Sequence, residues 1–179
     1  MEAGVTDPIA AALPPSSIDA ERSVLGAMLQ DSGAATLAFE TLVAADFYSA
    51  EHREIFEAMR ALHIAGNPVD LMTVGNELTR RGTLDGVGGA VYLLQAVRFV
   101  PTTANTRTYI QIVQEKSTLR RLISAAQTIQ RQCYAQSDQL PDVLHNAERL
   151  IFDIVMRRAG AETLVPLNKV LMSTFDQIE

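Results

Sequence analysis

The chain has 179 residues, of which 47% are apolar, so it is long enough to bury a sizeable core as one domain, or as one domain with an appendage. Its formal charge of -6 excludes nonspecific binding of nucleic acid by the whole chain, because neutralising phosphates requires an excess of Lys and Arg. One cysteine, Cys133, excludes an intrachain disulfide framework, and no apolar run approaches the about 20 residues that span a bilayer. We expect a cytoplasmic protein without membrane contact.

Residues 1–15 are predicted to be a disordered tail, because they hold three prolines and few large apolar side chains. Order is expected to begin at Ser16 or Ser17, either of which can cap a helix that ends near Asp31. The acidic Asp19 and Glu21 lie in its first turn, where the helix dipole favours them.

Residues 16–101 are predicted to form a compact head of short helices, because start signals, apolar stripes and stop signals recur. Ser49 and Asp70 can each cap a helix, and Gly66 and Gly82 can end these two helices in left-handed conformations. Gly88–Gly89 predicts a turn with positive φ angles. Residues 90–100 permit a strand, but no second segment of period two exists to pair with it, so we expect a helix.

Residues 102–159 are predicted to form a long antiparallel helical hairpin. After Thr102 or Thr103 the chain runs to about Ala135 without Gly or Pro, and a seam recurs every seven residues at Ile112, Leu119, Ala126 and Cys133. Such a seam needs a partner helix, which residues 142–158 supply with Val143, Ala147, Leu150 and Ile154.

The hairpin carries more apolar surface than one partner helix covers. In LIFDIVM, residues 150–156, only Asp153 is polar, so apolar side chains point around most of the helix. We therefore expect the hairpin to offer a surface to another chain. Residues 160–179 are predicted to be a link and an amphipathic linker helix whose binding groove lies on another domain.

No catalytic, cofactor-binding or metal site is predicted from residue spacing. His52, His63 and His145 lack a second ligand at i+3 or i+4, and we interpret them as exposed or capping side chains. Cys133 is interpreted as a small core residue of the seam. The segment GVGG, residues 86–89, matches no phosphate-binding loop.

Two groups of charged residues receive ordinary interpretations. Glu51, Glu54 and Glu57 lie opposite the apolar stripe of their helix and are expected to be a solvated face. Arg120–Arg121 and Arg157–Arg158 allow phosphate contact, although arginines beside an apolar seam commonly pair with acids across an interface.

Five segments in order resemble consecutive blocks of one family. They are SIDAERSVLGAML, DFYSAEHREIFEAM, GNPVDLMTVGNELTRRGTL, GGAVYLLQAV and PTTANTRTYIQIVQEKSTLRRLI. Together they resemble the N-terminal domain of the DnaB-type replicative DNA helicases, and the resemblance covers about Pro14 to Glu179. It implies an all-α fold: a helical head, a hairpin and a linker helix that leads to a RecA-like motor domain.

The resemblance also implies partners. In that family the hairpins pair, three dimers form a collar on the hexameric ring, and the collar docks the C-terminal domain of DnaG primase; a helicase loader is a further expected partner. The pairing residues expected here are Leu119, Leu122, Ile123, Ile129, Leu150, Ile151, Ile154 and Val155. The residues expected to contact the motor domain of a neighbouring subunit are Leu167, Val170, Leu171 and Phe175.

The chain departs from the family's full-length pattern because it contains no GxxxxGK[ST] sequence. We therefore expect it neither to hydrolyse ATP nor to unwind DNA alone, with ATP and Mg²⁺ bound only by the motor domain and DNA met only through the full ring. Two alternatives remain open at this point. One is the helicase-binding C-terminal domain of a primase, and the other is a small helical enzyme or ligand-binding bundle that uses His52, His63 and the acidic face.

Overall fold

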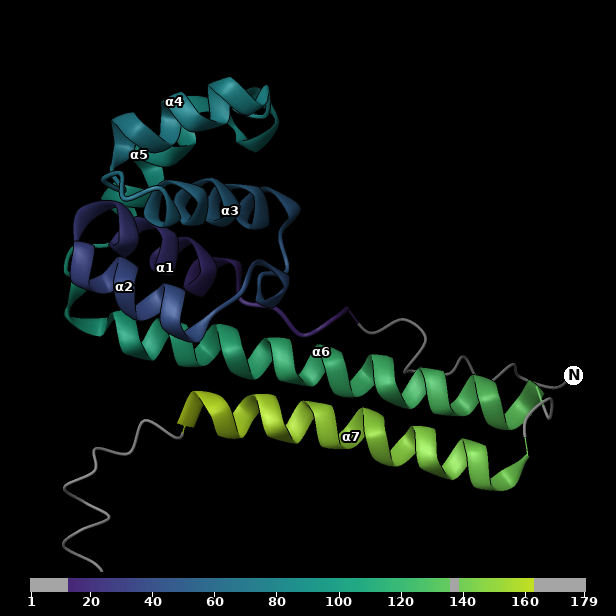
Figure 1. The fold of residues 1–179 in the computed structure, drawn as a ribbon. Helices are drawn as coiled ribbons and strands as arrows, with labels where there is room; N and C mark the ends of the chain where they lie inside the picture. Colours follow the sequence, from purple (N-terminus) through teal and green to yellow (C-terminus); the bar gives the residue numbers. More distant parts are fainter. Residues whose placement is uncertain (1–12, 136–138, 163–179) are drawn as a thin grey trace, which may run out of the picture. The chain divides into compact units, whose positions relative to one another are not determined.

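The fold is all-α, as predicted. The computed structural model describes residues 13–135 and 139–162, with side chains as far as Arg157, and every regular element in these ranges is a helix (Figure 1). The chain forms two compact units that divide between Arg120 and Arg121. The linker residues Leu167, Val170, Leu171 and Phe175 lie outside the described ranges.

The first unit contains five short helices and three 3-10 turns. The helices are α1 (Ile18–Gln30), α2 (Ser32–Thr41), α3 (Ala50–Ile64), α4 (Leu71–Arg81) and α5 (Gly89–Phe99). The turns are η1 (Ala44–Asp46), η2 (Asp85–Val87) and η3 (Thr103–Asn105). Helix α1 packs against α2, α3 and α5, and α4 packs against α3 and α5, so α1 and α3 form the centre of the bundle.

The predicted caps and stops set the helix ends. The side chain of Ser49 accepts a hydrogen bond from the backbone N–H of His52, and that of Asp70 accepts from the N–H groups of Met72 and Thr73. The bond from Thr73, more than that from Met72, holds the pKa of the Asp70 carboxyl below its usual value. Gly82 has a φ of 72°, the left-handed conformation predicted for the end of α4.

The core of the first unit also includes the start of the long helix α6 (Thr106–Ala135). Ile110 and Val113 are buried in the same cluster as Leu25 and Phe56. The first unit consequently extends to Arg120, whereas the sequence boundary was drawn between residues 101 and 102. Because α6 continues through the division without a break, no stop signal in the sequence marks it.

A glycine allows α1 and α5 to approach closely. A Cβ atom placed on Gly26 would lie 2.1 Å from the carbonyl oxygen of Ala96, closer than any van der Waals contact allows. Beside this crossing, Nε2 of Gln30 donates to the carbonyls of Val97 and Val100 at 2.9 and 3.2 Å, which satisfies carbonyl groups at the C-terminal end of α5.

Polar side chains hold the first half of α6 to the turn η1 and to the start of the described chain. Oγ of Ser117 donates to the buried carboxylate of Asp46 at 2.7 Å. The guanidinium of Arg120 donates to the carbonyl oxygens of Pro15 and Asp46 at 2.7 and 2.6 Å. Arg120, considered above for phosphate contact, therefore binds backbone carbonyls of its own unit.

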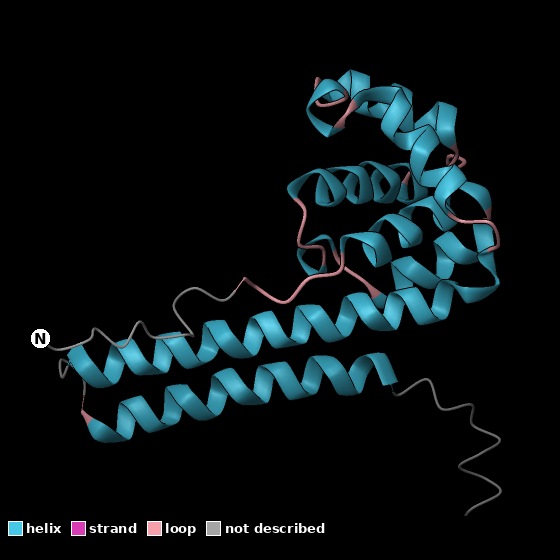
Figure 2. Ribbon diagram, turned by 180° about the vertical axis from the view of Figure 1, so that it is seen from behind, coloured by secondary structure: helices cyan, strands magenta, loops and turns pink. Residues whose placement is uncertain are grey.

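The second unit is the hairpin. Its helices are the second half of α6 and α7 (Leu140–Glu162), which run antiparallel and side by side in both views (Figure 1, Figure 2). Nδ2 of Asn146 donates to Oε1 of Gln132 at 2.8 Å and links the two helices. Pro141 occupies the first turn of α7, where its missing N–H costs no intrahelical bond.

Candidate interaction surface

Helix α7 exposes one stripe of apolar side chains. Leu140, Leu144, Ile151 and Val155 are spaced at i, i+4, i+11 and i+15, which places them on one side of a helix with 3.6 residues per turn. Between 43% and 70% of each residue's surface is exposed to solvent. Single exposed apolar residues are ordinary, whereas a continuous stripe of them indicates an interaction site.

Helix α6 adds the seam that the sequence predicted, but α7 does not cover it. Leu122, Ala126 and Cys133 are exposed, so the interpretation of Cys133 as a core residue is wrong. The side chains with reduced exposure are Ala125, Thr128, Ile129 and Gln132, which are displaced around the helix from the predicted seam. We call Leu122, Ala126 and Cys133 of α6, together with the four stripe residues of α7, the apolar side of the hairpin.

The inward side of α7 agrees with the predicted spacing. Val143, Ala147, Leu150 and Ile154 are half-buried and recur at i, i+4, i+7 and i+11. Leu150 and Ile154 line a pocket together with Ala125 and Thr128 of α6. The hairpin therefore has its own narrow apolar contact and leaves the larger apolar side in solvent.

The eight predicted pairing residues fall into two groups. Leu119, Leu122, Ile123, Ile151 and Val155 are exposed, while Ile129, Leu150 and Ile154 are half-buried. Leu119 belongs to the first unit and the other seven to the hairpin. Leu140 and Leu144 are exposed on the same stripe of α7 but are not among the eight, although their spacing of four from the helix start is visible in the sequence.

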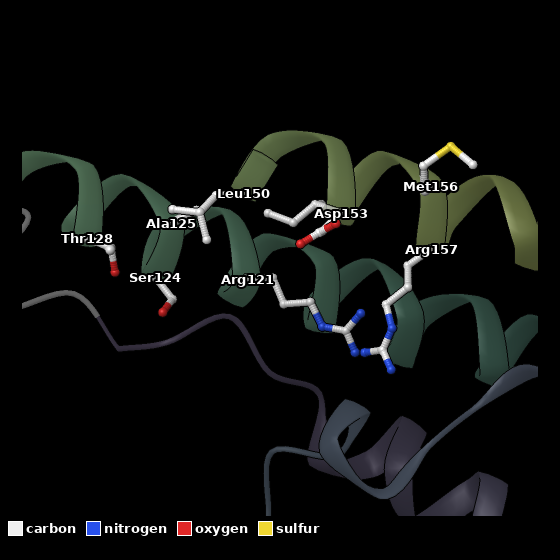
Figure 3. A pocket seen from close by; sticks show the side chains of 9 residues that line it. Arg121, Ser124, Ala125, Thr128, Leu150, Asp153, Met156 and Arg157 are labelled. Carbon is white, nitrogen blue, oxygen red and sulfur yellow. The ribbon is translucent and has the colours of Figure 1, made fainter. Parts of the chain in front are cut away.

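The opposite side of the hairpin contains the pocket lined by Leu150 and Ile154. Its volume is about 680 Å³, and it receives Arg121, Ser124 and Thr128 from α6 and Asp153, Met156 and Arg157 from α7. The guanidinium groups of Arg121 and Arg157 point toward one another, and the Asp153 carboxylate enters from α7 (Figure 3). We call this cavity the arginine pocket.

The first unit contains a buried network of hydrogen bonds that links three helices. Glu21 of α1 and His52 of α3 are each only 1% exposed, and Nδ1 of His52 lies 2.8 Å from Oε2 of Glu21. Nε2 of His52 lies 2.5 Å from the hydroxyl of Tyr92 on α5. The Glu21 carboxylate also accepts from the backbone N–H groups of Tyr48 and Ser49 at 2.6 and 3.2 Å.

A single tautomer of His52 accounts for all the hydrogen bonds of this network. In the tautomer with its proton on Nδ1, His52 donates to the Glu21 carboxylate, and Nε2 accepts from the Tyr92 hydroxyl. Burial raises the pKa of Tyr92 and so keeps its hydroxyl protonated as a donor. Because every polar side-chain atom of Glu21, His52 and Tyr92 has a partner, this network fixes the packing of α1, α3 and α5.

The burial of His52 corrects an interpretation made from the sequence. His52 is buried rather than exposed, because it lies on the same face of α3 as Ile55, Phe56 and Met59. That spacing was visible in the sequence. Glu21 lies in the first turn of α1, as expected, and its carboxylate is also an acceptor in the core; no local sequence signal indicates the distant amides that it binds.

The structure does not assemble the alternative site made of His52, His63 and the acidic face. His52 and His63 are eleven positions apart on one helix, about 16 Å along its axis, and His63 stacks on Phe39. Glu54 is half-buried rather than fully solvated, since it accepts from the Thr83 hydroxyl at 3.1 Å and pairs with Arg81 at 3.5 Å. In contrast, Glu51 is exposed, as expected.

A second pocket, of about 710 Å³, adjoins the buried network. Its walls come from the start of α1, the N-terminus of α3, the turn η2 and Tyr92. Gly88 and Gly89 have φ angles of 92° and 70°, the positive values predicted for this turn.

Among the residues that the structure describes, no group of three His, Cys, Asp or Glu side chains is placed to hold a metal ion. No helix in the described ranges is long and apolar enough to cross a membrane.

Comparisons with known proteins agree with this architecture. Residues 13–115 match the family model of the DnaB-like helicase N-terminal domain. The chain is 42% identical over 175 residues to the replicative DNA helicase DnaC of Bacillus subtilis (strain 168), covering 98% of this chain and 38% of the relative. It is 42% identical over 168 residues to the replicative DNA helicase DnaB of Geobacillus stearothermophilus, covering 93% and 37%.

Solved structures show the same fold. The crystal structure of the N-terminal domain of DnaB helicase from Mycobacterium tuberculosis superposes with a TM-score of 0.74 at 39% identity, over 79% of this chain and 99% of that one. A second structure, described as a DnaB-like replicative helicase and its interactions with primase, superposes with a TM-score of 0.67 over 90% of this chain and 36% of that one. At 24% sequence identity, this similarity shows a shared fold and no more.

The chain belongs to the DnaB-like helicase N-terminal domain family. This membership selects the helicase over the primase domain and the small helical enzyme that the sequence left open. The chain spans less than two-fifths of the length of the two curated helicases described above.

Proposed function

We propose that this chain is a scaffold domain of a replicative DNA helicase, in which the hairpin pairs with the hairpin of a second copy and the paired domains dock primase. The observation that carries the proposal is the apolar side of the hairpin, which exposes residues of both helices. Burying apolar surface contributes about 25 cal/mol per Å², so covering such a stripe favours association.

Self-association is supported by the division of the hairpin into two unlike sides. The half-buried Leu150 and Ile154 already pack toward α6, while Ile151 and Val155 on the next stripe have no contact that buries them within their unit. A second copy presents the same stripe, and a twofold interface needs a self-complementary surface. The expected assembly is a dimer, or three dimers in the collar of a hexameric ring.

Two adjacent residues test the pairing. Val155 and Met156 are 56% and 53% exposed, but Val155 lies on the apolar side and Met156 lines the arginine pocket. Val155→Asp places a charge in the proposed interface, so the purified variant is expected to elute as a monomer in size-exclusion chromatography with light scattering. Met156→Asp makes the same chemical change outside the interface and is expected to remain a dimer.

The outcome for the two variants decides the pairing surface. A dimeric Val155→Asp variant, or equal loss of association in both variants, contradicts pairing through the apolar side. A wild-type chain that stays monomeric across a wide concentration range contradicts pairing altogether.

Primase docking is the second part of the proposal. It is supported by the fold shared with the DnaB-like helicase that was solved with its interactions with primase, and by membership in the family. Adding the C-terminal domain of the cognate DnaG-type primase is expected to shift the dimer to a larger complex, and Val155→Asp is expected to weaken that shift. A dimer that ignores primase contradicts this part while leaving the pairing intact. A helicase loader is a further proposed partner.

The remaining parts of the proposal concern the whole helicase. We propose that ATP and Mg²⁺ bind in the part of the relatives that the alignment does not cover, that DNA is met through the assembled ring, and that the protein works in the cytoplasm. Residues 160–179 are proposed to contact the motor domain of a neighbouring subunit through Leu167, Val170, Leu171 and Phe175. A clean preparation of this chain is expected to show no ATPase activity, and measurable hydrolysis contradicts the assignment as a scaffold.

A further inference from the structure

The second pocket belongs to the first unit, whereas the proposed pairing uses the hairpin. Its walls come from Ile18 at the start of α1, from Tyr48 and the N-terminus of α3, from the turn η2 and from Tyr92 of α5. Because two tyrosines border it, we call this cavity of about 710 Å³ the tyrosine pocket. Its volume lies in the range of ordinary ligand pockets, about 300 to 1,000 Å³.

The walls of the tyrosine pocket are held in place by the buried network. The Glu21 carboxylate accepts from the backbone N–H groups of Tyr48 and Ser49, which fixes the entry into α3. His52 joins the same carboxylate to the Tyr92 hydroxyl, which fixes the wall from α5. An occupant therefore meets a preformed site, and little conformational entropy is lost in ordering it.

The lining of the pocket carries negative charge. Among the described residues that line it, Glu51 is the only acidic residue, and none is Lys or Arg. Glu51 is exposed, and its carboxylate accepts from the Ser49 hydroxyl at 2.5 Å. This hydrogen bond is the main cause that holds the pKa of Glu51 below its usual value, so Glu51 is ionised near neutral pH.

Charges around Tyr92 act in the same direction. Burial is the main cause that raises the pKa of Tyr92, and the positive charge of Arg22 lowers it. The negative charges of Glu51, Glu21 and Asp19 each raise it further. Arg22 is itself paired with Asp19 at 2.7 Å. Three carboxylates against one paired arginine favour an occupant that carries a positive charge.

The rest of the lining is apolar and aromatic. Ile18 and Tyr48 are 43% and 36% exposed, and Ala50 and Val87 complete the apolar part. Aromatic rings attract cations, arginine more often than lysine, and the Tyr48 ring has the guanidinium of Arg120, which does not line the pocket, 5.7 Å from its centroid. An arginine side chain suits such a lining, because it joins an apolar stem to a guanidinium that binds a carboxylate with two parallel hydrogen bonds.

An anionic occupant is disfavoured, although the pocket includes the N-terminus of α3. The backbone N–H of His52 is bound by the side chain of Ser49, and Glu51 places its own carboxylate in the first turn. A second anion would meet that carboxylate at close range.

We propose that the tyrosine pocket binds an arginine side chain of a partner protein, with its guanidinium on Glu51 and its stem against Ile18 and Tyr48. An apolar residue next to that arginine lies against Val87. The site thus takes a basic and apolar segment, and its use does not rest on pairing of the hairpin.

Titration of the chain with a short peptide tests the proposal. The probe is acetyl-Leu-Arg-Leu-amide, and the amide resonances of Tyr48, Glu51 and Gly88 are followed by NMR. We expect these resonances to shift with a dissociation constant of about 1 mM. The same peptide with citrulline in place of arginine keeps the shape and loses the charge, so it is expected to bind about fivefold more weakly.

Three variants separate the contact with Glu51 from general attraction. Glu51→Gln is expected to weaken binding of the arginine peptide about fivefold and to leave the citrulline peptide unchanged. Glu40→Gln is the matched control, because Glu40 is exposed on α2 and does not line the pocket, and it is expected to bind as the wild type does. Gly86→Leu is expected to weaken both peptides, since a Cβ atom on Gly86 meets no atom within 4 Å and the larger side chain has room to occupy the pocket.

Four results overturn the proposal. One is equal affinity for the two peptides, and another is equal weakening by Glu51→Gln and Glu40→Gln, which shows attraction by the overall charge of -6 instead of by the pocket. The others are shifts confined to residues outside the pocket, and no binding at about ten times the expected dissociation constant. Pairing is unaffected by each of these results, because the Val155→Asp variant tests it separately.

Discussion

The two units of this chain treat their apolar residues in opposite ways. In the first unit Val24, Met28 and Phe56 are completely buried, and even the polar Glu21 and His52 are enclosed with partners. In the hairpin Ile151 and Val155 are about half exposed although they lie on a regular helix. Short helices with frequent caps can fold back on one another to close a core, whereas two long antiparallel helices leave most of their circumference uncovered. A closed unit and an open unit in one chain are what the proposed scaffold role requires, in which a second copy covers the exposed apolar side of the hairpin.

The sharpest way to break this comparison is to remove one phenylalanine from each unit. Phe56→Ala is expected to destabilise the chain by about 4 kcal/mol, because it leaves a cavity among Phe39, Phe47 and their neighbours. Phe152→Ala, on a residue that is 60% exposed, is expected to change stability by about 0.5 kcal/mol or less. Urea unfolding followed by circular dichroism measures both, and equal effects contradict the contrast between the units.

Replacing one glutamate in each unit is expected to give the next largest difference in stability. Glu21→Gln keeps the shape but turns an amide group toward backbone donors, so we expect a loss of about 3 kcal/mol. Glu148→Gln makes the same change at an exposed position of α7 and is expected to be nearly neutral. If thermal unfolding shows the Glu21 variant to be as stable as wild type, the buried hydrogen bonds of Glu21, His52 and Tyr92 do not fix the packing of the three helices.

Two glycines in helices sharpen the comparison inside the first unit. Gly26→Ala is expected to cost about 2 kcal/mol, because the new methyl group collides with the carbonyl of Ala96. Gly75→Ala in α4 meets open space and is expected to stabilise by about 0.5 to 1 kcal/mol. The same sign of change at both positions, measured by chemical denaturation, rules out the close crossing of α1 and α5.

The smallest expected effect concerns the cap of α4. Asp70→Ala is expected to cost about 1 kcal/mol near neutral pH. The pKa of Asp70 is lower in the folded chain than in the unfolded chain, so its contribution is present above the unfolded value of 3.8 and is lost as the pH falls through the folded value. Unfolding curves of wild type and Asp70→Ala should thus converge in acid. A difference that stays constant from pH 7 down to pH 2 refutes this origin.

The sequence predicted the features that depend on residues close together in the chain, and it did not predict those that depend on residues far apart. Ser49, Asp70 and Gly82 act on neighbouring residues, so they located the helix ends correctly. The heptad spacing predicted the hairpin, but it did not reveal that Leu122 and Cys133 face solvent, because which side of α6 meets α7 depends on the whole helix pair. The Glu21–His52–Tyr92 network joins residues 31 and 40 positions apart, and no local pattern specifies such contacts.

The arginine pocket shows the same limit. Arg121 and Arg157 were recognised as arginines beside an apolar seam, yet only the antiparallel pairing of α6 and α7 brings them into one cavity (Figure 3).

The central claim is that the first unit is complete alone and that the hairpin is completed by a second copy. Amide hydrogen exchange at two protein concentrations, one well above and one well below the dimer dissociation constant, tests it most directly. We predict that protection of Val24–Met28 in α1 is independent of concentration, while protection of Val143–Val155 in α7 falls markedly on dilution. Protection of α7 that is as strong in the dilute monomer as in the concentrated sample would contradict the account.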